Sequence, residues 1–313
     1  MLVSLLPGVD RDNVERTLRE LSIEAYNLRG DAAGYVADPT ERIVRYAQWA
    51  HEAAQRLRGQ VSQADVDRLI LTRPYDRLLT MTDVGTMGIA TGLFFAELTA
   101  RIDDLQVAAD ALATEIKRWS ATGRLVVADT GVYLHGAKFE DIDFAKLIDE
   151  RQGPLHLVIP LAVVDELDNL KQSKDRLIRW RSRHTLAEFD RLLSEPSKPA
   201  LARLADYSPA ESEQGGVPRG AVTIELLLDP PRHVRLPITD DEIVDRAVAV
   251  QALASRVVTL LTYDTGMATR GRIAGLEVTK IPQPPDEPEP DGSRPAPKKG
   301  RYPVGQVSRS PKS

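Results

Sequence analysis

Cysteine is missing from all 313 residues of this chain, which excludes disulfides, zinc–thiolate sites and thiol nucleophiles. Histidine is scarce, and the five that occur show no spacing typical of a metal site, so we expect them on the surface or hydrogen-bonded in the core. The formal net charge of −5 does not by itself indicate nucleic-acid binding. Functional groups must therefore be sought among the carboxylates and in local concentrations of charge.

Long apolar runs are also missing. The longest weakly polar stretch, residues 85–96, is far shorter than the roughly 20 residues that a membrane span needs. The first six residues lack the basic start of a signal peptide. We therefore expect a soluble, cytoplasmic protein that makes no membrane contact.

Residues 1–122 are predicted to form an all-helical region. Asp38-Pro39 is a suitable N-cap and first helical residue, and a long helix is expected over about 91–120. Apolar residues recur along that helix in steps of three and four, at Phe95, Leu98, Ile102, Leu105, Ala109, Leu112, Ile116 and Trp119. We expect this seam to pack on helices of the same chain, and a homodimer through residues 91–120 is the alternative.

From Gly123 to about residue 281, short apolar runs alternate with helical stretches. This alternation is typical of an α/β domain with a central, mainly parallel sheet. The expected strands are 124–128, 155–159, 222–228, 257–261 and 276–280. The expected helices are 141–150, 161–172, 176–193, 240–254 and 266–274. Residues 194–220 are predicted to be a loop, and the proline-rich residues 282–313 a disordered tail.

Four acidic residues stand where a predicted strand ends or a predicted helix begins. Asp129 follows the first strand, Glu166 lies in the helix after the second, and Asp264 follows the run 257–261. Asp240 stands at the start of a further helix. In a parallel sheet these positions share one edge, where ligands bind. Clustered carboxylates repel one another unless a cation lies between them, and oxygen ligands favour Mg²⁺ or Mn²⁺. This arrangement favours a metal-dependent phosphodiesterase.

The same residues carry a resemblance to a known family. The segment Val-Val-Ala-Asp-Thr-Gly-Val-Tyr-Leu-His (126–135) resembles the opening of a PIN domain, and residues 158–171 resemble its second block. Residues 239–244 and 260–264 are similar to the third and fourth blocks. The four occur in the family's order over about 124–281, and the second is closest to PIN domains fused to PhoH-type ATPases. Gly131 departs from the asparagine that many members carry there.

The resemblance implies a PIN-like three-layer fold and an endoribonuclease that hydrolyses RNA with Mg²⁺ or Mn²⁺. The metal ligands and catalytic residues it implies are Asp129, Glu166, Asp240 and Asp264, with Asp241 and Asp245 as further candidates. Asp240 is preferred to Asp241 because it lies three residues before Ile243, the usual spacing. Thr130 and Thr262 are candidates to donate hydrogen bonds to the ligating carboxylates. The alternative is a catalytically inactive PIN-like protein that binds RNA or serves as a scaffold.

One local concentration of positive charge follows the Glu166 helix. Residues 171–184 contain one acid, Asp175, among many cations. The candidates for binding nucleic acid are Lys171, Lys174, Arg176, Arg179 and Arg183. A solvated basic helix is the alternative. We expect Trp180 in this stretch to pack in the core with Leu177 and Leu186, and stacking on a base is its alternative role.

Overall fold

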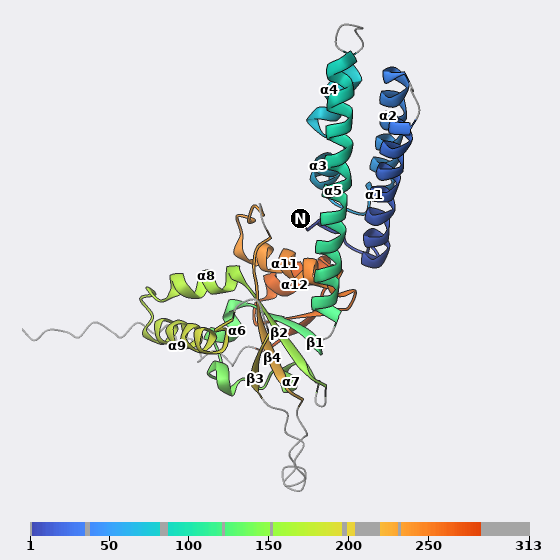
Figure 1. Ribbon diagram of the computed structural model, residues 1–313. Helices are drawn as coiled ribbons and strands as arrows, with labels where there is room; N and C mark the ends of the chain where they lie inside the picture. Colours follow the sequence, from blue (N-terminus) through green and yellow to red (C-terminus); the bar gives the residue numbers. More distant parts are fainter. Residues whose placement is uncertain are drawn as a thin grey trace, which may run out of the picture. The chain divides into compact units, whose positions relative to one another are not determined.

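The computed structural model describes residues 2–34, 38–81, 87–120, 123–150, 153–195, 199–203, 220–230 and 233–282 (Figure 1). The expected helical region comes first in the chain. It contains α1 (Arg11–Gly34), α2 (Pro39–Leu57), α3 (Gln63–Leu69), α4 (Arg73–Thr80) and α5 (Met87–Ser120). Asp38 caps α2 as predicted, its side chain accepting a hydrogen bond from Thr40 N. The predicted tail lies outside the described residues from 283 onward.

The helix α4 was not predicted, because Pro74 was interpreted only as the end of the preceding helix. In the structure Pro74 stands in the first turn of α4, where a missing N–H costs no helical hydrogen bond. Thr72 caps this helix by accepting a hydrogen bond from Tyr75 N. The preceding helix α3 already ends at Leu69, so the proline marks the start of α4.

The long helix α5 has 34 residues and is about 50 Å long at 1.5 Å per residue. Its predicted seam packs mainly against α1, and Leu98, Leu105 and Leu112 are fully buried there. The seam is thus covered within the chain over most of its length. Its last member, Trp119, belongs to a different apolar cluster, the core around the sheet.

The α/β part has a six-stranded sheet in the order β3-β4-β2-β1-β5-β6. Its strands are β1 (Arg124–Ala128), β2 (Leu155–Pro160), β3 (Ala200–Arg203), β4 (Val222–Leu227), β5 (Val258–Thr262) and β6 (Glu277–Lys280). All neighbours are parallel except β3 and β4, so the predicted mainly parallel sheet is confirmed. The strand β3 falls in the segment predicted to be a loop. It is a short, half-exposed edge strand without the apolar run that marks a buried one, and 204–219 lie outside the described residues.

Helices cover both faces of this sheet. Every residue of β2 and β5 is buried, and successive side chains of a strand point to opposite faces, so neither face is open to water there. The helices are α6 (Thr130–Leu134), α7 (Phe144–Leu147), α8 (Leu161–Leu170), α9 (Arg176–Leu192), α11 (Thr239–Ala254) and α12 (Thr265–Ile273). The helix expected over 141–150 is reduced to α7 and a 3₁₀ turn at Phe139–Asp141.

The last turn of α5 is tied to the sheet by buried polar contacts. Arg118 Nε donates to Glu225 Oε1 over 2.6 Å, and the other oxygen of Glu225 binds His156 Nε2 at 3.0 Å. The Trp119 ring meets the His156 ring edge-on at 6.2 Å, and Arg256 donates to the carbonyl of Trp119. Residues 1–281 form one compact unit, and the division at residues 122 and 123 stays a prediction.

Of the helices in the described part of the chain, none has both the length and the apolar character that crossing a bilayer requires.

Candidate metal centre

Asp129 stands where β1 ends and α6 begins. Its Oδ1 accepts a hydrogen bond from Val132 N at 3.0 Å, which caps α6. Its Oδ2 accepts one from the hydroxyl of Thr262, at the end of the neighbouring strand β5. The parallel register pairs Ala128 with Leu261, so the two strands end side by side. Asp129 is only 7% exposed, which is unusual for a carboxylate that has no basic partner among the described residues.

The Thr262 hydroxyl links Asp129 to the next predicted ligand. It accepts a hydrogen bond from Asp264 N at 2.9 Å while it donates to Asp129. Asp264 caps α12 by accepting from Met267 N at 2.7 Å. Two neighbouring strands therefore each end in an aspartate that caps the helix that follows. The Thr262 hydroxyl is hydrogen-bonded to both aspartates, to the side chain of Asp129 and the backbone N–H of Asp264.

The pKa of Asp129 reports how negative charge gathers at this edge. Burial raises this pKa most, and the charges of Asp240 and Asp264 add to the rise. Against the lowering effect of the hydrogen bonds from Thr262 and Val132, the pKa reaches about 6 from an ordinary value of 3.8. Asp129 is therefore close enough to both Asp240 and Asp264 to be affected by their negative charges.

Glu166, the fourth predicted ligand, lies in the second turn of α8. Its Oε2 accepts a hydrogen bond from the hydroxyl of Thr130 at 2.5 Å, and Thr130 directly follows Asp129. Thr130 and Thr262 thus each donate to a predicted ligand. No three of these four carboxylates bring ligand oxygens within 4.8 Å of one another.

Arg270 of α12 is a neighbour that the sequence did not reveal. Its Nε binds Asp241 Oδ1 at 2.8 Å, and its Nη1 lies 3.5 Å from Asp240 Oδ2. Arg270 therefore pairs more closely with Asp241 than with Asp240. The charge of Asp240 raises the pKa of Asp129, and this proximity favours Asp240 as the ligand. Asp245 is paired with Arg246 instead.

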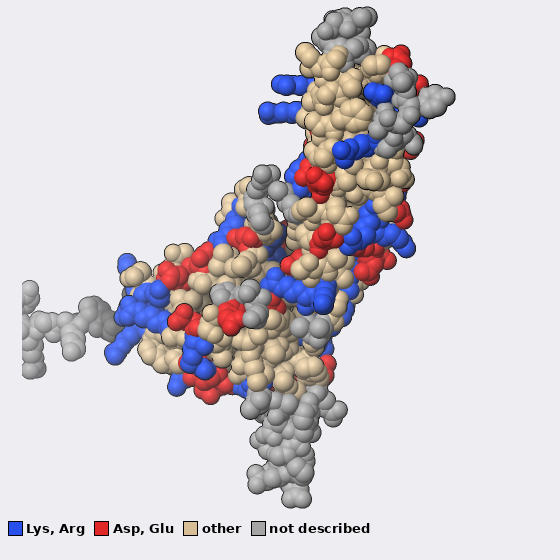
Figure 2. Space-filling model, in the orientation of Figure 1, with Lys and Arg blue, Asp and Glu red and all other residues tan. Residues whose placement is uncertain are grey.

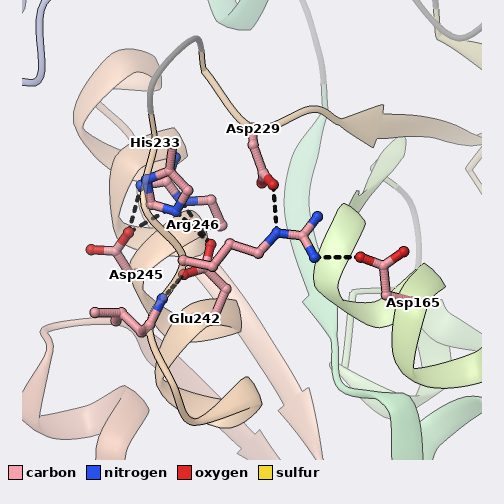
Figure 3. A network of polar contacts seen from close by, with 8 residues as sticks. Asp165, Asp229, His233, Glu242, Asp245 and Arg246 are labelled. Atoms are coloured by element: carbon pink, nitrogen blue, oxygen red, sulfur yellow. Dashed lines mark hydrogen bonds and ion pairs between the residues drawn. The ribbon is translucent and has the colours of Figure 1, made fainter. Parts of the chain in front are cut away.

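A second polar network lies beside the predicted site (Figure 3). Its centre is Glu242, which is 1% exposed and accepts hydrogen bonds from His233 Nε2 at 2.7 Å and Leu236 N at 2.8 Å. Asp229, His233 and Glu242 bring their ligand atoms within 4.8 Å of one another among the described residues. Sequence reasoning missed this group, because no periodicity relates His233 to Glu242.

Arginines already balance the acids of this network. Arg235 bridges Asp229, which follows β4, and Asp165 of α8, and Arg246 lies beside Glu242 and Asp245. Arg235 stands in the segment before α11, and its two acidic partners, Asp229 and Asp165, are labelled in Figure 3. The network therefore ties together the two helices that carry Asp240 and Glu166, and we interpret it as a support for the predicted site.

The basic stretch lies where α8 and α9 meet, and Lys and Arg side chains gather there on the face shown in Figure 2. Lys174, Arg176 and Arg183 are exposed. Lys171 pairs with Asp168, and Arg179 donates to the carbonyl of Ser173 at 2.7 Å.

The expectation that Trp180 packs in the core is wrong. The Trp180 side chain is 45% exposed and Leu177 is exposed beside it. The buried face of α9 carries Ser182, Thr185 and Phe189 instead. Trp180 lies two residues before Ser182, about 200° around the helix, and therefore points away from that face.

The predicted ligands fit a hard divalent cation. All four offer carboxylate oxygens, which select Mg²⁺ or Mn²⁺ over softer metals. Among the described residues, the hydrogen-bond partners of the buried Asp129 are a hydroxyl and a backbone N–H, and neither carries the positive charge that a cation would supply.

One comparison with known proteins identifies a family for the α/β part of the chain. A family model described as PIN domain matches residues 126–281. Among solved structures, the chain is similar to a domain of a functionally unknown protein from Methanocaldococcus jannaschii DSM 2661. The identity is 18% and the TM-score 0.32, over 53% of this chain and 96% of that one. No curated protein matches the chain. The narrower likeness to PIN domains fused to PhoH-type ATPases stays a prediction. Residues 126–281 of this chain belong to the PIN-domain family, whose members are generally nucleases and typically use divalent metals.

Proposed function

We propose that this protein is a metal-dependent endoribonuclease that hydrolyses RNA phosphodiester bonds, with Asp129, Glu166, Asp240 and Asp264 as the ligands of Mg²⁺ or Mn²⁺. The observation that carries the proposal is the buried Asp129, whose pKa is raised by burial and by the charges of Asp240 and Asp264. A PIN domain that gathers several carboxylates at the carboxyl edge of its sheet is suited to hold a cation.

The chemistry assigns a task to each group. A divalent cation held at this edge would supply positive charge to the phosphodiester and would activate water for attack on phosphorus. Asp129 must be ionised to bind the cation, and Thr262 holds its Oδ2 in place. Thr130 orients Glu166 in the same way. The exposed cations Lys174, Arg176 and Arg183, with Lys171 and Arg179 beside them, would attract the phosphate backbone.

A second candidate function follows from Arg270. Its guanidinium binds the acids at the start of α11, and a fixed positive charge there would compete with a cation. If this pairing persists with RNA bound, the protein is an inactive RNA-binding or scaffold protein.

The test is cleavage of end-labelled RNA by the purified full chain in Mn²⁺, in Mg²⁺ and in EDTA. We expect internal cleavage only with a divalent cation, and at least a hundredfold loss of rate in Asp129→Asn and Asp264→Asn. Asp175→Asn is the matched control, because Asp175 is an exposed helix N-cap on α9. RNA that is bound but never cut in either cation would favour the inactive alternative. Metal-dependent cleavage that survives Asp129→Asn would remove the assigned site.

A further inference from the structure

The outward face of α9 carries an aromatic stack that the proposed catalytic chemistry does not use. The rings of Trp180 and His184, one helical turn apart, lie 5.1 Å from centroid to centroid with only 10° between their planes. His184 Nε2 binds the Glu140 carboxylate at 2.8 Å, which fixes its ring. Nearly half of Trp180 is exposed, so a further flat ring has room to stack against it.

Two cations stand over the exposed indole. Lys138 Nζ lies 5.9 Å from the ring centroid, and the Arg181 guanidinium carbon lies 5.5 Å from it. Arg181 Nη2 donates to the carbonyl of Gly136 at 2.7 Å, whereas its Nε and Nη1 have no hydrogen-bond partner in the described part of the chain. Covered guanidinium donors without an acceptor cost free energy, so a small rotation toward an anionic oxygen would be favourable.

This cluster adjoins the acidic edge of the sheet through the segment after α6. A Cβ at Gly136 would lie 3.0 Å from the hydroxyl of Tyr263, and the His135 and Tyr263 rings meet edge-on at 6.4 Å. Tyr263 directly precedes Asp264. Residues 135–138 therefore lead from the predicted metal ligands at one end to Lys138, beside Trp180, at the other.

We propose that Trp180, His184, Lys138 and Arg181 form a subsite for an unpaired nucleobase and its adjacent phosphate in single-stranded RNA. The aromatic stack takes the flat base, and the two cations match the charge of the phosphate. Bases in a duplex are stacked and paired and cannot enter such a subsite. This inference rests on the proposed function for RNA as the substrate, but it concerns binding and not hydrolysis.

Binding is measured on the full chain in EDTA, so that cleavage plays no part. The probe is a 12-nucleotide single-stranded RNA, and a duplex of the same length is the comparison. Tryptophan fluorescence reports the contact selectively, because Trp49 is 8% and Trp119 0% exposed. We expect single-stranded RNA to quench the emission, and Trp180→Ala to weaken its binding about 5- to 100-fold. Trp180→Phe should restore most of the affinity, since phenylalanine also stacks.

Two controls separate stacking from charge. Tyr26→Ala removes another exposed aromatic, 63% exposed on α1, and should leave the affinity unchanged. Lys138→Ala should lower the salt dependence of log Kd by about 0.7 for one lost phosphate contact, whereas Trp180→Ala should leave that slope unaltered.

Equal affinity of Trp180→Ala and the unaltered protein for single-stranded RNA would overturn the subsite, as would equal loss of affinity for the duplex. Quenching by RNA without any cleavage in Mn²⁺ would leave the subsite standing and remove the proposed nuclease activity.

Discussion

Replacing Asp129 by asparagine should stabilise the metal-free protein, although it removes a predicted ligand. Asparagine keeps an oxygen to cap α6, and its amide can donate to the Thr262 hydroxyl. It removes a charge whose burial holds the pKa at about 6 against 3.8 for an ordinary aspartate. That difference corresponds to about 3 kcal/mol of destabilisation once Asp129 is fully ionised.

The gain should depend on pH in a defined direction. The folded protein binds the proton of Asp129 more tightly than the unfolded chain does, so protonation of Asp129 stabilises the fold. This stabilisation is fully present below about pH 4 and is lost as the pH rises through about 6. Asp129→Asn should therefore gain about 3 kcal/mol at pH 7.5 and roughly half of that at pH 5.

The assay is urea unfolding in EDTA, followed by circular dichroism at both pH values. Asp175→Asn, the exposed N-cap of α9, should change the free energy of unfolding by less than about 0.5 kcal/mol at either pH. A variant no more stable than the unaltered protein at pH 7.5, or a gain that is the same at pH 5, would refute the argument from burial.

Three further substitutions test the surroundings of the site. Trp119→Ala should lower the free energy of unfolding by about 3–5 kcal/mol, because the ring is fully buried in the core around the sheet. Urea unfolding measures this loss, and a loss below about 1 kcal/mol would contradict the placement of the ring in that core. Arg270→Gln should tighten Mn²⁺ binding about two- to fivefold, because it frees Asp240 from its ion pair. Calorimetric titration measures this affinity, and weaker binding would show that Arg270 supports the site. Glu242→Gln should destabilise the protein by about 1–3 kcal/mol, since His233 and the backbone N–H of Leu236 lose a charged acceptor. An unchanged midpoint of urea unfolding would refute the supporting role of this network.

The fold was predictable where burial leaves a pattern in the sequence. Strands covered on both faces appear as continuous apolar runs, so 124–128 and 257–261 were placed correctly to within a residue. An edge strand such as β3 is half exposed and leaves no such run. The seam of α5 predicted the helix, but helical spacing does not show which core receives each residue. Trp119 therefore fell outside the predicted sheet domain.

The candidate site was predictable only in part, for a related reason. Strand ends and helix starts locate Asp129, Asp240 and Asp264 along the chain, and parallel pairing then brings their charges together. Arg270 and Arg235 reach their acids through long side chains across different helices, and no spacing in the sequence signals such contacts. Trp180 was misplaced because its apolar character says nothing of which face of α9 is buried.

The proposed function requires that the carboxylates at this edge of the sheet hold a divalent cation. Calorimetric titration of the purified chain with Mn²⁺ at pH 7.5 tests it directly, without RNA and without turnover. We expect a saturable binding event that weakens at least tenfold in both Asp129→Asn and Asp264→Asn and is unchanged in Asp175→Asn. Mn²⁺ binding of equal strength in all four proteins, or no binding at millimolar Mn²⁺, would contradict it.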